Sequence, residues 1–330
     1  MTLHVAVTGG AGFLGTRLAH RLLSEPVSLA GRPPTDVTRL TLLDLVAPAE
    51  DLAEHPRVRL LVGELEASVD QLDDPDVIFH LAGVVSSAAE QDFDLGMRTN
   101  VDGTRALLEY ARRMDRPPVV VFTSSLAVFG NDPAFPPLDG VDDDTLPRPQ
   151  SSYGIQKFIG EQLIADYTRR GFLRGRSVRL MTVSVRPGKP NAAASSFLSS
   201  IIREPLAGSR ARCPVDPDTP IALSSPIRTV AGIMTAARAS DEDWGSTTAV
   251  NLPALTTTPR DMAAALDAVA GAGTSNLIDW DHDPAIAAIV ESWPAKIGSR
   301  RAERLGLTAD PDFHSIIRHF RAETGAAAPQ

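Results

Sequence analysis

The chain has 330 residues, of which 43% are hydrophobic and 22% are charged, so it is typical of a folded globular protein and not of a disordered or collagenous one. Its formal net charge of −9 argues against a nucleic-acid-binding protein, which would present a clustered basic face. The single cysteine, Cys213, excludes an internal disulfide. No secretory signal precedes the first apolar run, and no run reaches the roughly 18 residues of a membrane helix. We therefore expect a cytoplasmic protein with neither a membrane nor nucleic acid as a partner.

The first 130 residues alternate short apolar runs with longer amphipathic stretches. This alternation is typical of a parallel sheet covered by helices on both faces. The pattern predicts helices over Phe13–Ser24 and Asp92–Arg113. It predicts strands over Leu3–Thr8, Arg39–Asp44, Val58–Val62, Val77–Leu81 and Val119–Ser124. The expected fold is therefore α/β, with a Rossmann-type doubly wound parallel sheet.

The second half of the chain is less regular. A proline-rich stretch, residues 129–152, predicts a long loop, and a helix from Tyr153 to about Arg170 follows it. Next we expect a strand over Ser177–Val185 and then helices near Val230–Ala239, over Pro259–Val269 and in a final pair between Pro284 and Glu323. We predict that residues 1–188 form the sheet domain. Residues 189–330 would mainly form a smaller, mixed α/β substrate lobe, with some segments returning to the first domain.

A glycine-rich turn follows the first predicted strand and opens the first predicted helix. Residues 8–15 read TGGAGFLG, with glycines at positions 9, 12 and 15. Missing side chains let the backbone approach a dinucleotide pyrophosphate, and the helix N-terminus offers unpaired N–H groups to it. The flanking strand and helix favour this interpretation over an ordinary tight turn.

Asp44 ends the second predicted strand. A carboxylate there can accept hydrogen bonds from both adenine-ribose hydroxyls and would repel a 2′-phosphate, so we expect NAD rather than NADP. It comes later after the glycines than the usual interval of about 20 residues, and the insertion at residues 31–34 accounts for the delay. Arg32 and Arg39 lie close in sequence and leave NADP open.

Tyr153 and Lys157 are the sharpest chemical signal. Their spacing places the phenol and the ammonium on one helix face, where the cation would lower the pKa of the tyrosine from about 10 toward working pH. Ser125, at the end of the fifth predicted strand, could polarise the same substrate oxygen. A surface Tyr/Lys pair is the alternative for this spacing taken alone.

Over its first 190 residues or so, the chain resembles the extended short-chain dehydrogenase/reductases, also called the NAD-dependent epimerase/dehydratase family. Several motifs in order carry the resemblance: residues 8–15, Asp44, residues 63–65 (GEL), 80–83 (HLAG), 100–104 (NVDGT), Ser124-Ser125, Tyr153/Lys157 and residues 186–188 (RPG). Two positions depart from the family pattern. Glu64 stands where the family usually has Asp, and Phe129 replaces a common Tyr.

The resemblance implies roles for individual residues. Ser125, Tyr153 and Lys157 would be the catalytic set, and Asn100 would support it. The homodimer common in the family would form through helices 92–113 and 153–170. The residues expected to bind NAD are Gly9, Gly12, Phe13, Leu14, Asp44, Glu64, Leu65, Leu81, Ala82, Gly83, Asn100, Tyr153 and Lys157.

The substrate side shows a narrower likeness. Residues 183–197 and 222–226 resemble family members that oxidise a four-carbon sugar acid at C2 with NAD. Enzymes of the family that act on sugar nucleotides usually follow an Arg in the second lobe with a hydrophobic run and an Asp, whereas here Arg228 is followed by Gly232. A short polar pocket could instead meet one carboxylate. Its candidate residues are Ser125, Lys189, Asn191, Ser195, Ser196 and Arg228.

The sequence therefore predicts a dehydrogenase that removes hydride from C2 of a small sugar acid, with Tyr153 as the base. An NDP-sugar epimerase or dehydratase with tightly bound NAD is the alternative. A non-catalytic NAD-binding regulator is a third possibility, which the intact catalytic set disfavours. The seven histidines show no paired ligand spacing, so we expect no metal site.

Overall fold

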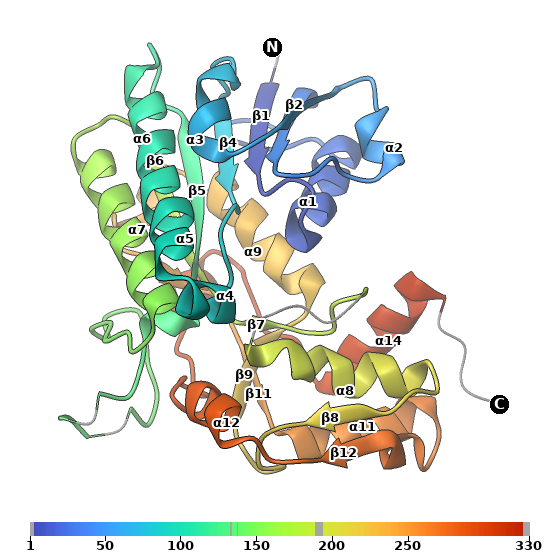
Figure 1. The fold of residues 1–330 in the computed structure, drawn as a ribbon. Coiled ribbons are helices and arrows are strands. Elements are labelled where there is room, and N and C mark those ends of the chain that lie inside the picture. Colours follow the sequence, from blue (N-terminus) through green and yellow to red (C-terminus); the bar gives the residue numbers. More distant parts are fainter. Residues whose placement is uncertain (1–2, 133, 137, 189–193, 326–330) are drawn as a thin grey trace.

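A seven-stranded parallel sheet forms the centre of the molecule (Figure 1). We describe residues 3–132, 134–136, 138–188 and 194–325 of a computed structural model. The strand order is β10-β6-β5-β4-β1-β2-β3. Chain order therefore reverses between β1 and β4, and ligands of such sheets bind outside the carboxyl ends of the strands at that point. The bounds are β1 Leu3–Thr8, β2 Val37–Asp44, β3 Val58–Val62, β4 Val77–His80, β5 Val119–Ser125, β6 Arg174–Leu180 and β10 Val250–Asn251.

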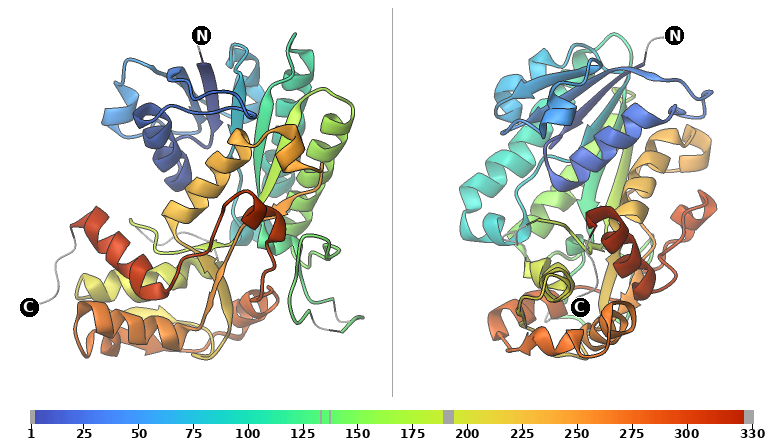
Figure 2. Two further views of the ribbon diagram at one scale, coloured as in Figure 1. Left: turned by 180° about the vertical axis from the view of Figure 1, so that it is seen from behind. Right: turned by 90° about the vertical axis from the view of Figure 1, so that its right-hand side faces the viewer.

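The predicted doubly wound fold is confirmed, and the burial pattern explains it. All six residues of β1 are buried, because helices cover both faces of the sheet. Alternate strand residues pack against α1 (Phe13–Ser24) and α9 (Pro226–Arg238) on one face, and against α6 (Gly103–Arg113) and α7 (Ser152–Arg169) on the other. Figure 2 shows these layers from behind and from the side. Along the chain, the short helix α2 (Glu50–Ala53) connects β2 to β3, and the short helix α3 (Leu65–Ser68) follows β3.

The helix expected over Asp92–Arg113 is confirmed, since the chain is helical without a break from Phe93 to Arg113. What the sequence did not predict is a π-helical turn over Met97–Asp102, which divides the helix into α5 (Phe93–Gly96) and α6, and the short helix α4 (Ser86–Gln91) before it. The Asp92 side chain accepts a hydrogen bond from Leu95 N and so begins α5. The π-helical turn carries Asn100, whose side chain bonds to two other segments, and such turns often lie at functional sites.

The predicted strand over Ser177–Val185 is broken at Met181. Residues up to Leu180 belong to the central sheet, whereas β7 (Thr182–Val183) pairs with β9 (Ile221–Ser224) of a second sheet. The chain therefore passes from the sheet domain into the lobe at this point, directly after the carboxyl end of β6.

The lobe has its own apolar core beneath the central sheet (Figure 1). Its sheets have the orders β11-β9-β7 and β12-β8. A helix that the sequence analysis missed, α8, packs on this core. The remaining elements are α8 Phe197–Leu206, β8 Ala211–Cys213, α10 Asp241–Trp244, β11 Leu255–Thr257, α11 Pro259–Ala270, β12 Ile278–Trp280, α12 Pro284–Glu291, α13 Arg300–Arg304 and α14 Phe313–Thr324.

Several segments from the second half of the chain return to the sheet domain, and Trp244 and Ala302 join its core. β10 pairs with β6, and α9 covers the face that α1 also covers. α9 begins four residues earlier than predicted, because Ser225 caps it by accepting a hydrogen bond from Arg228 N and Pro226 occupies its first turn. In the part of the chain that the structure describes, no helix is both long and apolar enough to cross a membrane.

Candidate active site

The glycine turn packs too closely for side chains. Gly9 has φ of +72°, and a Cβ on it would lie 2.8 Å from Ala82 N. A Cβ on Gly15 would lie 2.0 Å from Gly9 O. Gly9 N donates to Leu43 O at 2.8 Å, so the turn is joined to the end of β2. The first turn of α1 therefore lies against the carboxyl ends of the strands, where its free N–H groups can receive phosphate.

Asp44 lies beside this turn. Its Oδ2 accepts from Ala11 N at 3.0 Å and its Oδ1 from Leu45 N at 2.7 Å, which leaves further lone pairs for ribose hydroxyls. The two arginines that left NADP open lie elsewhere. Arg39 forms an ion pair with Asp73 at 2.6 Å, and Arg32 lines a separate hollow together with Asp76. The structure thus favours NAD at this position.

Other predicted cofactor residues divide into two groups. Phe13, Leu14, Leu81 and Gly83 line the cavity with Gly9 and Gly12. Five predicted residues are missing from the described lining of this cavity: Asp44 beside the glycine turn, Asn100 in the π-helical turn, and Ala82, Glu64 and Leu65. Ala82 donates its N–H to Thr8 Oγ1 at 3.3 Å, Glu64 is exposed before α3, and Leu65 packs in the core under α6. The roles of these three stay predictions.

Asn100 connects the segment after β4 to α7. Its Oδ1 accepts from Val84 N at 2.8 Å, and its Nδ2 donates to Val84 O at 3.1 Å and to Gln156 Oε1 at 2.8 Å. Gln156 directly precedes Lys157. Asn100 is therefore placed to hold α7 in register with the cavity wall.

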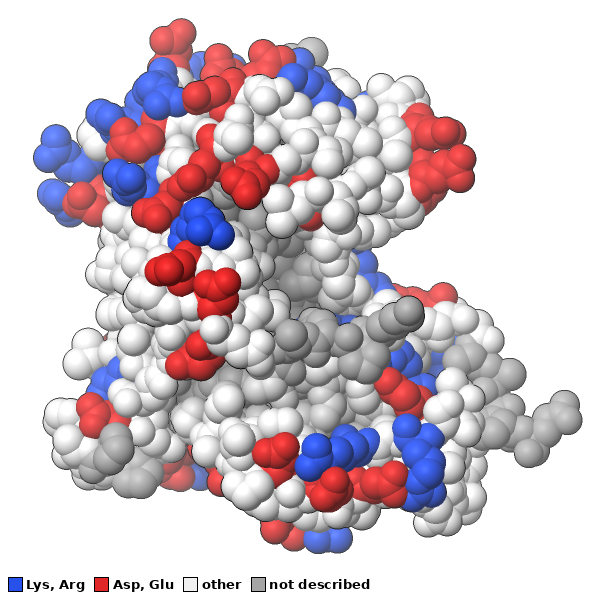
Figure 3. All heavy atoms as spheres, viewed as in Figure 1, with Lys and Arg blue, Asp and Glu red and all other residues white. Residues whose placement is uncertain are grey.

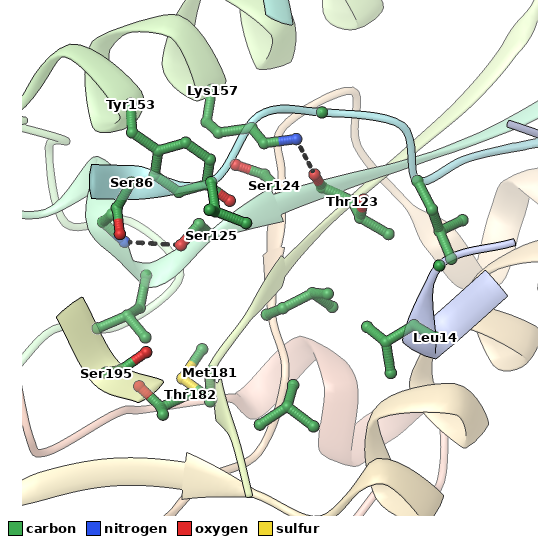
Figure 4. A pocket seen from close by; sticks show the side chains of 18 of the residues that line it. Leu14, Ser86, Thr123, Ser124, Ser125, Tyr153, Lys157, Met181, Thr182 and Ser195 are labelled. Carbon is green, nitrogen blue, oxygen red and sulfur yellow. Dashed lines mark hydrogen bonds between the residues drawn. The ribbon is translucent and has the colours of Figure 1, made fainter. Parts of the chain in front are cut away.

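A close helix–loop contact brings Tyr153 to Ser125. Ser151 caps α7 by accepting from Gly154 N at 3.1 Å. A Cβ on Gly154 would lie 2.1 Å from Ala127 O, so only glycine lets the first turn of α7 approach the segment after β5. Figure 4 shows the result: the Tyr153 and Lys157 side chains extend from α7 beside Ser124 and Ser125, with Leu14 across the cavity.

Burial shifts the pKa of both members of the Tyr/Lys pair. The Lys157 ammonium donates to Thr123 O at 3.0 Å and lies 5.7 Å from the centroid of the Tyr153 ring. Burial lowers the pKa of Lys157 to about 8. The expected lowering of the Tyr153 pKa is wrong for this structure: burial raises it, while the Ser125 hydroxyl and the Arg186 guanidinium act in the opposite direction. The desolvation of the phenolate outweighs these stabilising groups.

The catalytic candidates share one cavity with residues of the lobe. Its volume is about 300 Å³, and the lobe contributes Thr182, Arg186, Ser195 and Trp293 to its lining. Figure 4 shows Thr182 and Ser195 on the side opposite Tyr153, and Figure 3 shows the molecule hollowed between the sheet domain and the lobe.

The predicted substrate residues do not all meet there. Ser125 and Ser195 line the cavity. Arg228 is exposed on the first turn of α9 and is not part of the described lining, so the structure does not bring it to Ser125. Lys189 and Asn191 lie outside the described residues. Ser196 borders a neighbouring hollow that also includes Trp293.

Sequence reasoning missed a buried ion pair behind the cavity. Glu161 and Arg179 are 2% and 5% exposed, and Arg179 Nη2 donates to Glu161 Oε2 at 2.8 Å. Glu161 Oε1 also accepts from Ser124 Oγ at 2.5 Å. The signal available in the sequence was the position of Glu161, one helical turn after Lys157. The pair joins the end of β5 to α7 and β6.

Other candidate centres have structural explanations. His80 lies between Thr8 Oγ1 at 2.7 Å and Thr104 Oγ1 at 2.9 Å. Thr104 donates its own proton to Asn100 O, so His80 Nε2 must be the donor and Nδ1 the acceptor, as in a neutral ring. Burial accordingly lowers the pKa of His80 to about 3. Among the described residues, no group of three or more His, Cys, Asp and Glu side chains could hold a metal ion.

Together, the doubly wound sheet, the glycine turn and the Ser/Tyr/Lys cavity define a dinucleotide-dependent enzyme. The model of the NAD dependent epimerase/dehydratase family matches residues 5–217, and the chain belongs to this family. The resemblance predicted from the sequence is thereby confirmed. NAD is the cofactor, and the residues fit it: Gly9, Gly12 and Gly15 line the cavity at the first turn of α1, and Asp44 stands beside this turn.

Two relatives with assigned activities and one solved structure are similar to this chain over almost its whole length. The chain is 48% identical over 329 residues to D-erythronate dehydrogenase from Cupriavidus necator, a match that covers 98% of this chain and 100% of that one. It is 41% identical over 322 residues to D-erythronate dehydrogenase from Haemophilus influenzae, with 96% and 98% covered. The crystal structure of the nucleoside-diphosphate-sugar epimerase from Agrobacterium tumefaciens superposes with a TM-score of 0.90 at 37% identity, covering 100% of this chain and 97% of that one.

Proposed function

We propose that this protein is an NAD-dependent dehydrogenase that oxidises the C2 hydroxyl of a small sugar acid, D-erythronate, to the 2-oxo acid. The observation that carries the proposal is the cavity in which Ser125, Tyr153 and Lys157 meet the glycine turn. The two dehydrogenases that match nearly the whole chain support D-erythronate as the substrate.

The proposed mechanism assigns proton transfer to the phenol. The Tyr153 hydroxyl, in its ionised form, takes the proton of the substrate hydroxyl, and the Ser125 hydroxyl holds the same oxygen. Bound NAD supplies the acceptor for the hydride that leaves the carbon. Burial raises the pKa of Tyr153 in the protein alone, so the ionised form needs added positive charge nearby. The Lys157 ammonium, whose pKa is about 8 and which is mostly charged at neutral pH, would supply part of this charge, and the nicotinamide ring of bound NAD would supply the rest.

A substrate panel tests this function. NADH formation at 340 nm is followed with D-erythronate, its C2 epimer D-threonate and longer aldonates, with UDP- and dTDP-sugars beside them. We expect stoichiometric NADH with the four-carbon acid and a lower kcat/KM with longer chains. The absence of NADH with every acid in the panel would refute the proposal.

An NDP-sugar epimerase or dehydratase is the second candidate, and the Agrobacterium structure favours it by its description. Two features of the lobe argue against this candidate. Arg228 is exposed and does not belong to the described cavity lining. A Cβ on Gly232 would lie 2.6 Å from Leu252 Cδ1, so this position has no space for the Asp that usually follows the Arg in sugar-nucleotide enzymes. NAD that copurifies and never appears as free NADH, together with turnover of a sugar nucleotide, would establish this alternative.

We further propose that the protein forms a homodimer. Phe93 on α5 and Ile155 on α7 are 60% and 47% exposed, so each of the helices expected at the interface presents an apolar side chain. A single monomeric species in sedimentation at micromolar concentration would refute the dimer. The cytoplasmic location stays a prediction.

A further inference from the structure

The cavity holds positive charge that its own lining does not balance. Its described lining includes two cations, Lys157 and Arg186, and no aspartate or glutamate. The Lys157 ammonium donates to Thr123 O beside the phenol, and so is committed to the catalytic set. A partly buried cation without a counter-ion is unfavourable, and an anionic ligand supplies the missing charge. The cavity therefore favours a substrate with a negative group near Arg186.

Arg186 is held at its backbone and at Nε, while the end of its side chain is left to the cavity. Its Nε donates to Val183 O at 3.0 Å, its N donates to Ser199 Oγ at 3.0 Å, and its O accepts from Arg203 Nη1 at 2.8 Å. Arg203 is itself paired with Glu204 at 2.6 Å. Within the described residues, no carboxylate pairs with Arg186 and its two terminal nitrogens form no hydrogen bond. Their donors remain for a ligand.

The guanidinium and the phenol lie within electrostatic reach of each other. Burial raises the pKa of Tyr153, and the charge of Arg186 acts against that rise. Burial lowers the pKa of Arg186, and ionised Tyr153 acts against that fall. In a 2-hydroxy acid, the carboxylate is bonded directly to the carbon that bears the hydroxyl. A carboxylate at Arg186 therefore presents that hydroxyl to Ser125 and Tyr153, whereas a hydroxyl at the far end of the chain is held away.

We propose that Arg186 binds the carboxylate of the substrate and thereby selects the adjacent hydroxyl for oxidation. The guanidinium offers paired donors that match a carboxylate, and Thr182 and Ser195 offer hydroxyls to the rest of a short polyol chain. The ligand class is a short 2-hydroxy carboxylate. This inference rests on the proposed dehydrogenase function, and it assigns to Arg186 a role that the sequence pattern gave to Lys189, Asn191 or Arg228.

The first experiment compares an acid with its neutral analogue. Arg186→Met and Arg186→Lys are assayed as NAD-saturated enzymes with D-erythronate and with D-erythronamide, and Arg169→Met, an exposed arginine at the end of α7, is the matched control. We expect kcat/KM for the acid to fall about 30-fold or more in Arg186→Met, mainly through KM, with partial recovery in Arg186→Lys. In the same variant, kcat/KM for the amide should fall by less than about threefold. Equal losses for acid and amide, or no loss for the acid, would overturn the proposal.

A binding measurement separates this inference from the proposed reaction. Calorimetry gives the Kd of D-erythronate for the NADH-saturated protein, in which no turnover occurs. We expect Arg186→Met to raise this Kd about 30-fold or more and Arg169→Met to leave it unchanged. If the wild type oxidises no acid, the proposed function fails, yet this titration still decides whether Arg186 binds carboxylate. A Kd that Arg186→Met leaves unchanged would refute the role of Arg186 even in an active dehydrogenase.

Discussion

The buried pair of Glu161 and Arg179 makes a sharp prediction about stability. Both Glu161 oxygens accept from Arg179, at 2.9 Å from Nε and at 2.8 Å from Nη2, and Oε1 also accepts from Ser124. Beyond Glu161, the guanidinium has Asn251 Oδ1 at 3.4 Å and the Phe129 ring centroid at 4.8 Å. Removal of the glutamate would thus leave a charge in an interior that offers it only weak partners.

The size of the effect follows from this burial. Removing one member of a buried pair costs about 3–5 kcal/mol, since the other charge is left uncompensated. Total stabilities are about 5–15 kcal/mol, so Glu161→Met and Arg179→Met should each remove a large share. The double variant Glu161→Met/Arg179→Met buries no charge, and it should lie within about 2 kcal/mol of the wild type.

Urea unfolding followed by circular dichroism measures the free energy of unfolding of the wild type, the two single variants and the double variant. The control is Arg210→Met, which removes an exposed arginine paired with Asp279 and should cost less than about 1 kcal/mol. Single variants whose free energy of unfolding falls no more than that of this control would refute the reasoning. A double variant that loses the sum of the two singles would refute it as well, because the two charges would then not be coupled.

Three further predictions concern the site. Tyr153→Phe should lower kcat by about 10²-fold or more and leave the Kd of NAD within about threefold, and unchanged turnover would contradict its role as the base. Ser125→Ala removes a group that lowers the pKa of Tyr153, so the acid limb of kcat/KM against pH should move to higher pH; an unmoved limb would contradict this. His80 has its folded pKa lowered from 6.5 to about 3, so the unfolded chain binds the extra proton between these values and stability falls as pH falls. Relative to His80→Gln, the wild type should lose about 1.4 kcal/mol per pH unit between pH 6 and 4 in urea titrations, and parallel pH profiles would contradict it.

Local patterns sufficed for the parts of the fold that local chemistry determines. β1, β3 and α1 have the predicted bounds, because continuous apolar runs and helical periodicity report burial directly. The glycine turn and the Ser125/Tyr153/Lys157 set met in one cavity as expected, since the carboxyl ends of parallel strands share one edge of the sheet.

Long-range contacts determine the features that the sequence pattern missed. The π-helical turn around Asn100 depends on partners in Val84 and Gln156, which lie far apart in the chain. The break at Met181 depends on pairing with β9, and the orientation of Arg186 depends on Ser199 and Arg203 of α8, a helix that was not predicted. None of these contacts produces a periodic pattern in the sequence, so the position of Arg186 in the cavity lining can be seen only in the folded chain.

Isotope transfer tests the central claim most directly. D-Erythronate labelled with deuterium at C2 is oxidised with unlabelled NAD, and both products are analysed by mass spectrometry. Oxidation at C2 predicts one deuterium in the NADH, none at C2 of the 2-oxo acid, and a slower kcat/KM than with unlabelled acid when hydride transfer limits it. Unlabelled NADH together with deuterium retained in the product acid would show that the hydride leaves another carbon, and would contradict the account.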